Sequence, residues 1–163
     1  MAKKKKVPQQ QALSPERYIK EKARLLPIVE CWITDGWDKC GLGTAIVARQ
    51  HKNGNYTLGI YMFDTFCCGL TDSLYHFNVP EYEYREMLEE GCATLEMNPI
   101  SYEELHNLIY GAVAFAEEAG LGPHSSFKLT QYILEEDTDE IPLIEYEFGK
   151  DGKHFLVATS RFQ

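Results

Sequence analysis

The sequence lacks the signatures that assign many proteins to a function. It has no Cys-x-x-Cys pair, so the sequence does not predict a structural zinc site. Its glycines form neither the Gly-x-Gly-x-x-Gly dinucleotide-binding pattern nor the Gly-x4-Gly-Lys-Ser/Thr phosphate-binding pattern. No apolar run approaches the ~20 residues that span a membrane, and no apolar signal segment follows the first lysines. We therefore expect a soluble cytoplasmic protein with no metal, no cofactor and no membrane contact.

Positive charge is scarce beyond the first six residues. The net charge is −9 at pH 7, and removing the four charges of Lys3, Lys4, Lys5 and Lys6 leaves −13 on the rest of the chain. Because binding to phosphates needs a basic face, the acidic body is a poor match for nucleic acid. The four lysines lie in residues 1–13, which have no apolar period. We expect this segment to be a disordered basic tail that contacts RNA or an acidic partner only weakly.

The cysteines indicate reduced thiols. The chain has five, an odd number, and no export signal precedes them. Cys67 and Cys68 are adjacent, so their side chains would point to opposite faces of an extended backbone, which disfavours a shared metal ion.

Hydrophobic patterning predicts a single α+β domain over residues 14–163. Alternating apolar residues predict strands at residues 28–34, 44–49, 56–63, 144–148 and 155–159. Helices are expected at residues 14–27, 80–90 and 101–120, with a short one after Ser125 or Ser126. The helix at 101–120 has the strongest signal, because Ser101 and Glu104 form a capping box and Ile109 lies on its apolar stripe. The expected fold is a mainly antiparallel sheet of about five strands packed against helices.

One stretch, Tyr56 to Phe77, gathers the side chains that could perform chemistry. An apolar strand there leads into what reads as a loop, which carries five catalytic candidates: Asp64, Cys67, Cys68, Asp72 and His76. Each also has an ordinary structural explanation, because an Asp after a strand commonly forms a turn and an unpaired Cys is commonly a small buried apolar residue.

Two residues outside this stretch are candidates for binding. Trp37 lies in a glycine-rich segment, residues 35–43, where it could contact a partner or fold back over the core. His124 could serve as a binding residue or as a base for a thiol nucleophile.

Part of the chain resembles a family of uncharacterised bacterial proteins. Asp64, Cys67, Gly69 and Asp72 match an Asp-x-x-Cys-x-Gly-x-x-Asp segment that follows an apolar strand in that family, and residues 122–136 and 145–157 resemble its C-terminal part. The resemblance implies a bacterial protein, and it implies no activity.

Three functional hypotheses follow. The first is a non-enzymatic domain that binds another macromolecule, most simply a protein, because the chain combines an acidic body with many tyrosines. The second is a small hydrolase whose thiol or divalent metal site lies between Asp64 and His76. The third, a nucleic-acid-associated factor acting through the basic tail, has the least support from the net charge. We favour protein binding, and convergence of the candidate side chains in one accessible cleft would favour the enzyme.

Overall fold

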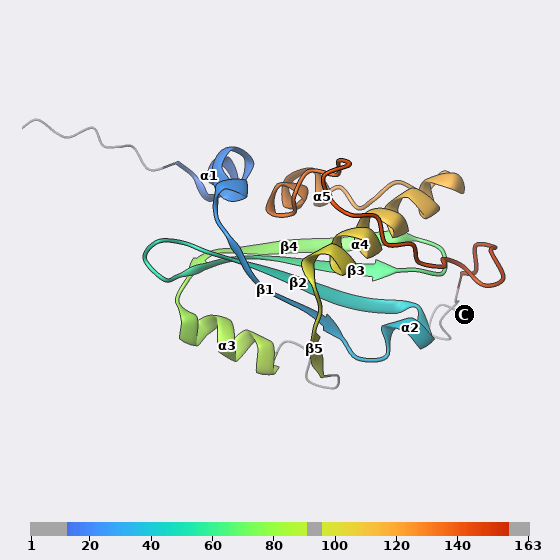
Figure 1. The fold of residues 1–163 in the computed structure, drawn as a ribbon, viewed down its shortest axis with the longest axis horizontal. Coiled ribbons are helices and arrows are strands. Elements are labelled where there is room, and N and C mark those ends of the chain that lie inside the picture. Colours follow the sequence, from blue (N-terminus) through green and yellow to red (C-terminus); the bar gives the residue numbers. More distant parts are fainter. Residues whose placement is uncertain (1–12, 91–95, 157–163) are drawn as a thin grey trace, which may run out of the picture.

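The computed structural model describes residues 13–90 and 96–156, and it has the expected α+β architecture in one domain. Its sheet has five antiparallel strands in the spatial order β4-β3-β2-β1-β5 (Figure 1). The strands are β1 (Ile28–Thr34), β2 (Leu42–Gln50), β3 (Tyr56–Asp64), β4 (Gly69–Val79) and β5 (Met97–Pro99).

The helices lie on both sides of this sheet. The longer ones are α1 (Pro15–Lys22), α3 (Glu81–Glu90) and α4 (Tyr102–Glu118), and the short ones are η1 (Ala23–Leu25), α2 (Trp37–Cys40), α5 (Phe127–Thr130) and η2 (Gln131–Ile133). In Figure 1, α1, α4 and α5 lie above the sheet and α3 lies below it. We call these two sides the upper face and the lower face. No helix in residues 13–90 and 96–156 is long and apolar enough to cross a membrane.

The helix caps predicted at Ser14 and Ser101 are confirmed, and the short helix after Ser126 is present without a side-chain cap. The Ser14 hydroxyl accepts a hydrogen bond from the Arg17 amide at 3.2 Å at the start of α1. At the start of α4, the Glu104 amide donates to the Ser101 hydroxyl and the Ser101 amide donates to the Glu104 carboxylate, which completes the capping box.

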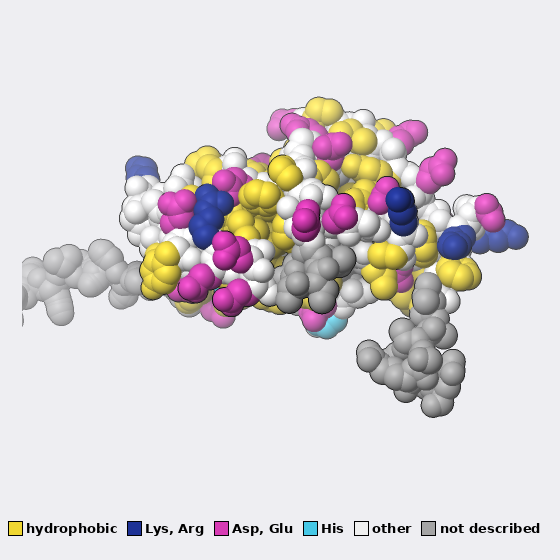
Figure 2. Space-filling model, turned by 90° about the horizontal axis from the view of Figure 1, so that it is seen from below, with side chains coloured by type: hydrophobic (Ala, Val, Ile, Leu, Met, Phe, Trp, Pro, Cys, Tyr) yellow, Lys and Arg dark blue, Asp and Glu magenta, His cyan; other side chains and the backbone are white. Residues whose placement is uncertain are grey.

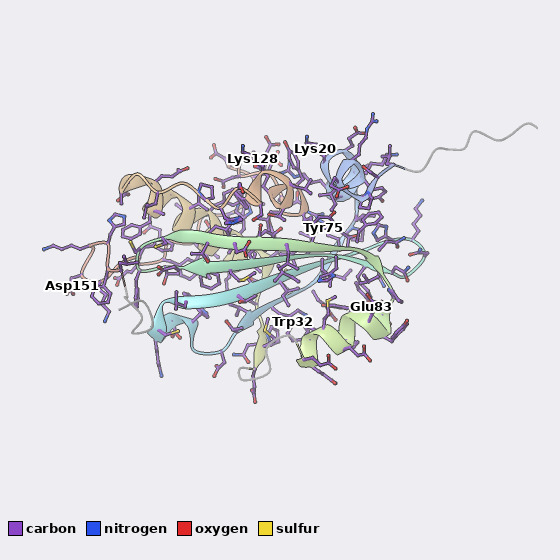
Figure 3. All side chains as sticks on the ribbon, turned by 180° about the vertical axis from the view of Figure 1, so that it is seen from behind. Lys20, Trp32, Tyr75, Glu83, Lys128 and Asp151 are labelled. Atoms are coloured by element: carbon purple, nitrogen blue, oxygen red, sulfur yellow. The ribbon has the colours of Figure 1, made fainter. Side chains whose placement is uncertain are left out.

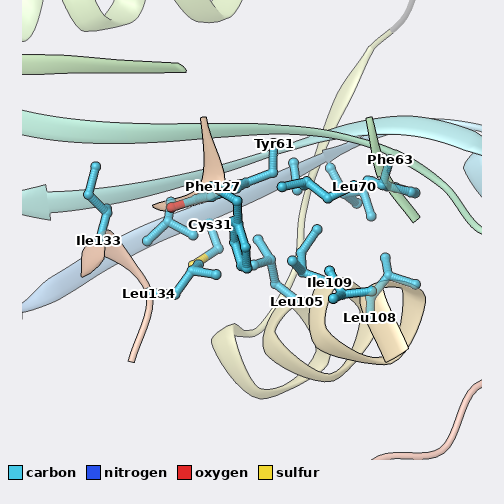
Figure 4. Close-up of a cluster of buried hydrophobic side chains, with 14 of the residues drawn as sticks. Cys31, Tyr61, Phe63, Leu70, Leu105, Leu108, Ile109, Phe127, Ile133 and Leu134 are labelled. Atoms are coloured by element: carbon cyan, nitrogen blue, oxygen red, sulfur yellow. The ribbon is translucent and has the colours of Figure 1, made fainter. Parts of the chain in front are cut away.

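The main core lies between the upper face of the sheet and α4. Alternate strand residues such as Val47, Tyr61 and Phe63 point upward, and Leu105, Leu108 and Ile109 of α4 pack onto them (Figure 4). Ile109 is completely buried, as the helical stripe predicted. Gly69 permits close packing at one end of this core, because its φ is +70° and a Cβ there would lie 2.8 Å from the Ala112 carbonyl oxygen.

A second, smaller cluster holds α3 against the lower face. Tyr84 is completely buried there among Ala48, Tyr56, Leu58 and Val79, with Met87 and Leu88 packed beside them. The Tyr84 hydroxyl also donates to Glu30 at 2.7 Å and accepts a hydrogen bond from the Trp32 indole at 2.9 Å. These contacts fix α3 to β1 and leave its last turn beside the middle of the sheet.

Two sequence predictions about strands are wrong. The segment from Asp64 to His76 is not mainly a loop, because the chain turns at 65–68 and continues as β4. Residues 144–148 form no strand. Tyr146 and Phe148 instead pack over Trp37 and Gly111, and no strand among residues 13–90 and 96–156 pairs with this segment. Residues 155 and 156 are also not in a strand, while residues 157–159 and tail residues 1–12 lie outside the described residues. The fifth strand of the sheet is instead β5, which pairs with β1 and which the sequence pattern did not predict.

Candidate functional site

Asp64 organises the turn between β3 and β4. Its carboxylate accepts hydrogen bonds from the amides of Phe66 at 2.9 Å and Cys68 at 3.2 Å, and its side chain is largely buried. These contacts occupy both carboxylate oxygens, so the residue forms a hairpin turn in the manner typical of Asp.

The adjacent thiols lie in the same turn and are poorly suited to nucleophilic attack. Cys67 is buried and Cys68 is partly buried. Burial, together with hydrogen bonds to Asp64 and Cys67, raises the pKa of the Cys68 thiol to about 12. A catalytic thiol requires the opposite shift, because the thiolate is the reactive form.

Asp72 and His124 meet at the outer edge of β4. His124 Nδ1 lies 3.5 Å from an Asp72 carboxylate oxygen and 2.9 Å from the Ser126 hydroxyl oxygen. The Ser126 hydroxyl is hydrogen-bonded to the Ser73 hydroxyl at 2.6 Å, and the Ser73 hydroxyl is hydrogen-bonded to the Thr130 hydroxyl at 2.7 Å. An acid, an imidazole and a serine are therefore neighbours here, as in a hydrolase triad.

The hydrogen-bond directions in this group differ from those of a triad. A triad histidine uses one ring nitrogen for the carboxylate and the other for the serine. Here both the Asp72 carboxylate and the Ser126 hydroxyl face Nδ1 of His124, and the Ser126 amide also donates to that nitrogen at 3.1 Å. The imidazole thus acts as a local acceptor that helps shape the turn before α5.

His76 is separated from the other candidates. It lies on β4 opposite Leu58 of β3 and lines a groove on the lower face, whereas Asp64 lies in the hairpin turn. Within residues 13–90 and 96–156, no three His, Cys, Asp or Glu side chains are placed to hold a metal ion together. The structure therefore groups Asp64 with the two thiols, groups Asp72 with His124, and leaves His76 alone.

Trp37 folds back over the core. Its ring packs edge-on against Phe63 at 6.0 Å and Tyr146 at 5.9 Å between centroids, and the side chain is partly buried. Of the two roles open to it from the sequence, the packing role is the one that these contacts fill.

The groove on the lower face, which we call the methionine groove, is the site that sequence reasoning missed. It has a volume of about 270 Å³ and is lined by β2, β3, β4, α3 and β5. Its apolar lining includes Ile46, Ile60, Met62, Leu74, Met87 and Met97. The chain has four methionines, and this one groove holds every methionine except Met1. They are far apart in the sequence, so they meet only through the strand pairing and the packing of α3 against the sheet.

The rim of the methionine groove is acidic along α3. Its sequence contains five glutamates, Glu81, Glu83, Glu86, Glu89 and Glu90, and a single arginine, Arg85. In the view from below, acidic side chains gather over α3 beside apolar surface (Figure 2).

Comparisons of the chain with protein families, with curated proteins and with solved structures found no match.

Proposed function

We propose that this protein is a non-enzymatic binding module that holds a basic amphipathic helix of another protein in the methionine groove. The observation that carries the proposal is the gathering of Met62, Met87 and Met97 in one apolar groove beside an acidic helix. Helix-in-groove recognition reads apolar residues at helical spacing, which is the chemistry that such a groove accepts.

Methionine suits a surface of this kind. Its side chain is unbranched and polarisable, so a methionine lining adapts to partners whose apolar residues differ in shape. The surrounding Ile46, Ile60 and Leu74 supply apolar area, and Leu74 is 39% exposed. Removing such surface from water favours binding at about 25 cal/mol per Å².

The charge of the rim favours a basic partner. The glutamates of α3 outnumber its single arginine, and Arg85 already pairs with Glu30 at 2.9 Å and with Glu81 at 3.2 Å. Lysines or arginines on the polar side of a bound helix would meet this negative field, which steers association and disfavours acidic partners.

The candidate catalytic residues do not support the alternative of a small hydrolase. Their separation within the described residues leaves no cleft in which a thiol or carboxylate pair meets a histidine base with the expected geometry. The free thiols Cys31, Cys40, Cys67 and Cys68 fit a reducing compartment, and we infer a cytoplasmic location on that basis.

The test uses the methionine methyl groups as reporters. Protein labelled with ¹³C-methyl methionine is titrated with a synthetic helical peptide of leucine and lysine, and NMR follows the four methyl signals. We expect the signals of Met62, Met87 and Met97 to shift and saturate while that of Met1 stays in place. Added salt should weaken the binding, because rim charges are screened.

Two controls make the result specific. A peptide with the same leucines and with glutamate in place of lysine should bind far more weakly. Ile60→Glu should abolish binding, whereas Leu25→Glu, at a site 80% exposed and outside the groove, should leave it unchanged. Equal binding of both peptides, or shifts that spare the three groove methionines, would rule the proposal out.

A further inference from the structure

We propose that the outer edge of β4 pairs with β4 of a second copy of this chain, antiparallel and centred on Leu74. This inference goes beyond the binding of a helix, because it concerns another surface and another partner. Among residues 13–90 and 96–156, β4 is an edge strand of the sheet and pairs only with β3. Figure 3 views the molecule from this side, with β4 facing the reader between α1 and α5 above and α3 below.

The edge is almost free of other backbone partners. Outside the sheet ladder, one backbone hydrogen bond reaches β4 from elsewhere in the described residues, from the His124 amide to the Leu70 carbonyl at 3.0 Å. The Ser73 amide donates a hydrogen bond to the neighbouring Asp72 carboxylate at 2.8 Å. At the far end of this 11-residue strand, the Asn78 amide donates to the Thr57 hydroxyl and the Asn78 carbonyl accepts from the Asn55 side chain. Between these contacts, from Leu74 to Phe77, the strand presents donors and acceptors to which another strand could pair.

Between its two register irregularities, β4 has little of the side-chain protection that is usual for an edge strand. Proteins block such edges with lysines, prolines or charged side chains that disfavour pairing. From Ser73 to Val79 the strand contains no Lys, Arg, Asp, Glu or Pro, and it includes Leu, Tyr, Phe and Val, which favour strands. A strand of this composition is suited to pairing with another strand along its outer edge.

The sequence of the edge is complementary to itself. Regular pairing with β3 runs from Asp72 to His76, between two register irregularities, so its midpoint is Leu74. An antiparallel pair centred there puts Leu74 opposite Leu74, Ser73 opposite Tyr75 and Asp72 opposite His76. Apolar then faces apolar, which is a favourable cross-strand pair. The Asp72 carboxylate, which lies 3.5 Å from His124 of its own chain, would exchange that imidazole for His76 of the second copy. This match selects a second copy over an unrelated peptide, because a two-fold interface uses the same patch twice.

The pairing has a geometric consequence for the methionine groove. A two-fold axis perpendicular to the joined sheet leaves the lower faces of both copies on the same side. Leu74 and His76 line the groove in each copy, so the two grooves lie on either side of the joint. The dimer would thus offer two neighbouring grooves on one continuous sheet.

Cysteine cross-linking tests the register residue by residue. In a background carrying Cys40→Ser and Cys92→Ser, Leu74→Cys should form a dimer on oxidation with diamide, because residues directly opposite have Cα atoms about 4.5–5.5 Å apart, within disulfide range. Asp72→Cys alone and His76→Cys alone should not, since each would lie roughly 14 Å from its own copy. The double variant with Asp72→Cys and His76→Cys should cross-link.

Sedimentation of the unmodified full chain provides the measurement that needs no substitution. We expect a concentration-dependent shift from monomer to dimer in the absence of any peptide. A chain that stays monomeric at all concentrations overturns the proposal, and so does cross-linking of Asp72→Cys as fast as that of Leu74→Cys. Circular dichroism of each variant establishes that it is folded before its cross-linking is compared.

Discussion

The guanidinium of Arg49 lies 3.0 Å from the Glu135 carboxylate, although the Arg49 side chain is only 1% exposed. The same guanidinium donates to the carbonyl oxygens of Ile133 and Leu26, each at 2.6 Å. One buried arginine on β2 therefore joins the sheet to the end of η2 and to the segment before β1. Because all its partners are far away in the sequence, it holds three separate parts of the chain together.

Arg49→Leu should lower the free energy of unfolding by about 2–5 kcal/mol, since it leaves the carbonyl oxygens of Ile133 and Leu26 without this donor. Urea denaturation measures the change. Arg17→Leu is the control, because Arg17 pairs with Glu21 at the exposed surface, and it should change the free energy of unfolding far less. Equal losses in the two variants would show that Arg49 does not hold these segments together.

Gly69→Ala should destabilise the protein more than Gly54→Ala. Both glycines have positive φ, at +70° and +91°, which costs an alanine about 1–2 kcal/mol. At Gly54 the new Cβ would meet open space, whereas at Gly69 it would meet Ala112 and Ala116 of α4 at 2.8 Å. The clash should add about 1–3 kcal/mol. Thermal or urea unfolding of the matched pair measures the difference, and identical values would exclude close packing of this turn on α4.

Alkylation should separate the thiols by environment. Cys40 is exposed, so iodoacetamide at pH 8 should modify it before Cys31 and Cys68. Burial raises the pKa of the Cys31 thiol and of the Cys68 thiol to about 12, so their thiolate fractions stay small until the pH approaches that value. Peptide mapping over a pH series measures the order. Rapid modification of Cys68 near pH 7 would contradict this environment and favour a thiol enzyme.

The stability contributed by Glu30 should depend on pH. Burial opposes its ionisation, but hydrogen bonds from Arg85 and Tyr84 outweigh burial and lower the pKa of this carboxyl below its ordinary 4.5. A lowered pKa in the folded state means that the contribution is complete above pH 4.5 and is lost as the pH falls through the folded value. The destabilisation caused by Arg85→Leu, measured by urea unfolding, should therefore shrink below pH 4.5. In a Glu30→Gln background that pH dependence should vanish, and its persistence would place the effect on Glu81.

Local signals account for what could be predicted of the fold. The capping box at Ser101 and the apolar spacing that includes Ile109 are encoded within one turn to a few turns of helix, so α4 was predictable. Strand β4 was missed because the register shift between Leu70 and Asp72 breaks its alternation, and polar residues at that point resemble a loop. Residues 144–148 show the reverse error. Their alternate apolar residues predict a strand, but such residues can equally pack as an irregular segment against helices, as Tyr146 and Phe148 do.

The candidate site was harder to predict than the fold. His76 and Asp64 are close in the sequence, yet one lies on a strand face and the other caps a turn. Met62, Met87 and Met97 are far apart in the sequence and meet only through the antiparallel pairing and the placement of α3. No periodicity within a short window carries that information.

The order of elements along the chain has a consequence for synthesis on the ribosome. The four strands β1–β4 come from one continuous stretch, residues 28–79, but α4 and α5, which cover their upper face together with α1, are made later. At 5–20 residues per second, translation from residue 80 to residue 134 takes roughly 3–10 s. During that interval α1 is the only one of the three upper-face helices named above that has been made, and Val47, Tyr61 and Phe63 lack the cover of α4. The nascent chain therefore exposes apolar surface of the kind that chaperones bind until its second half emerges.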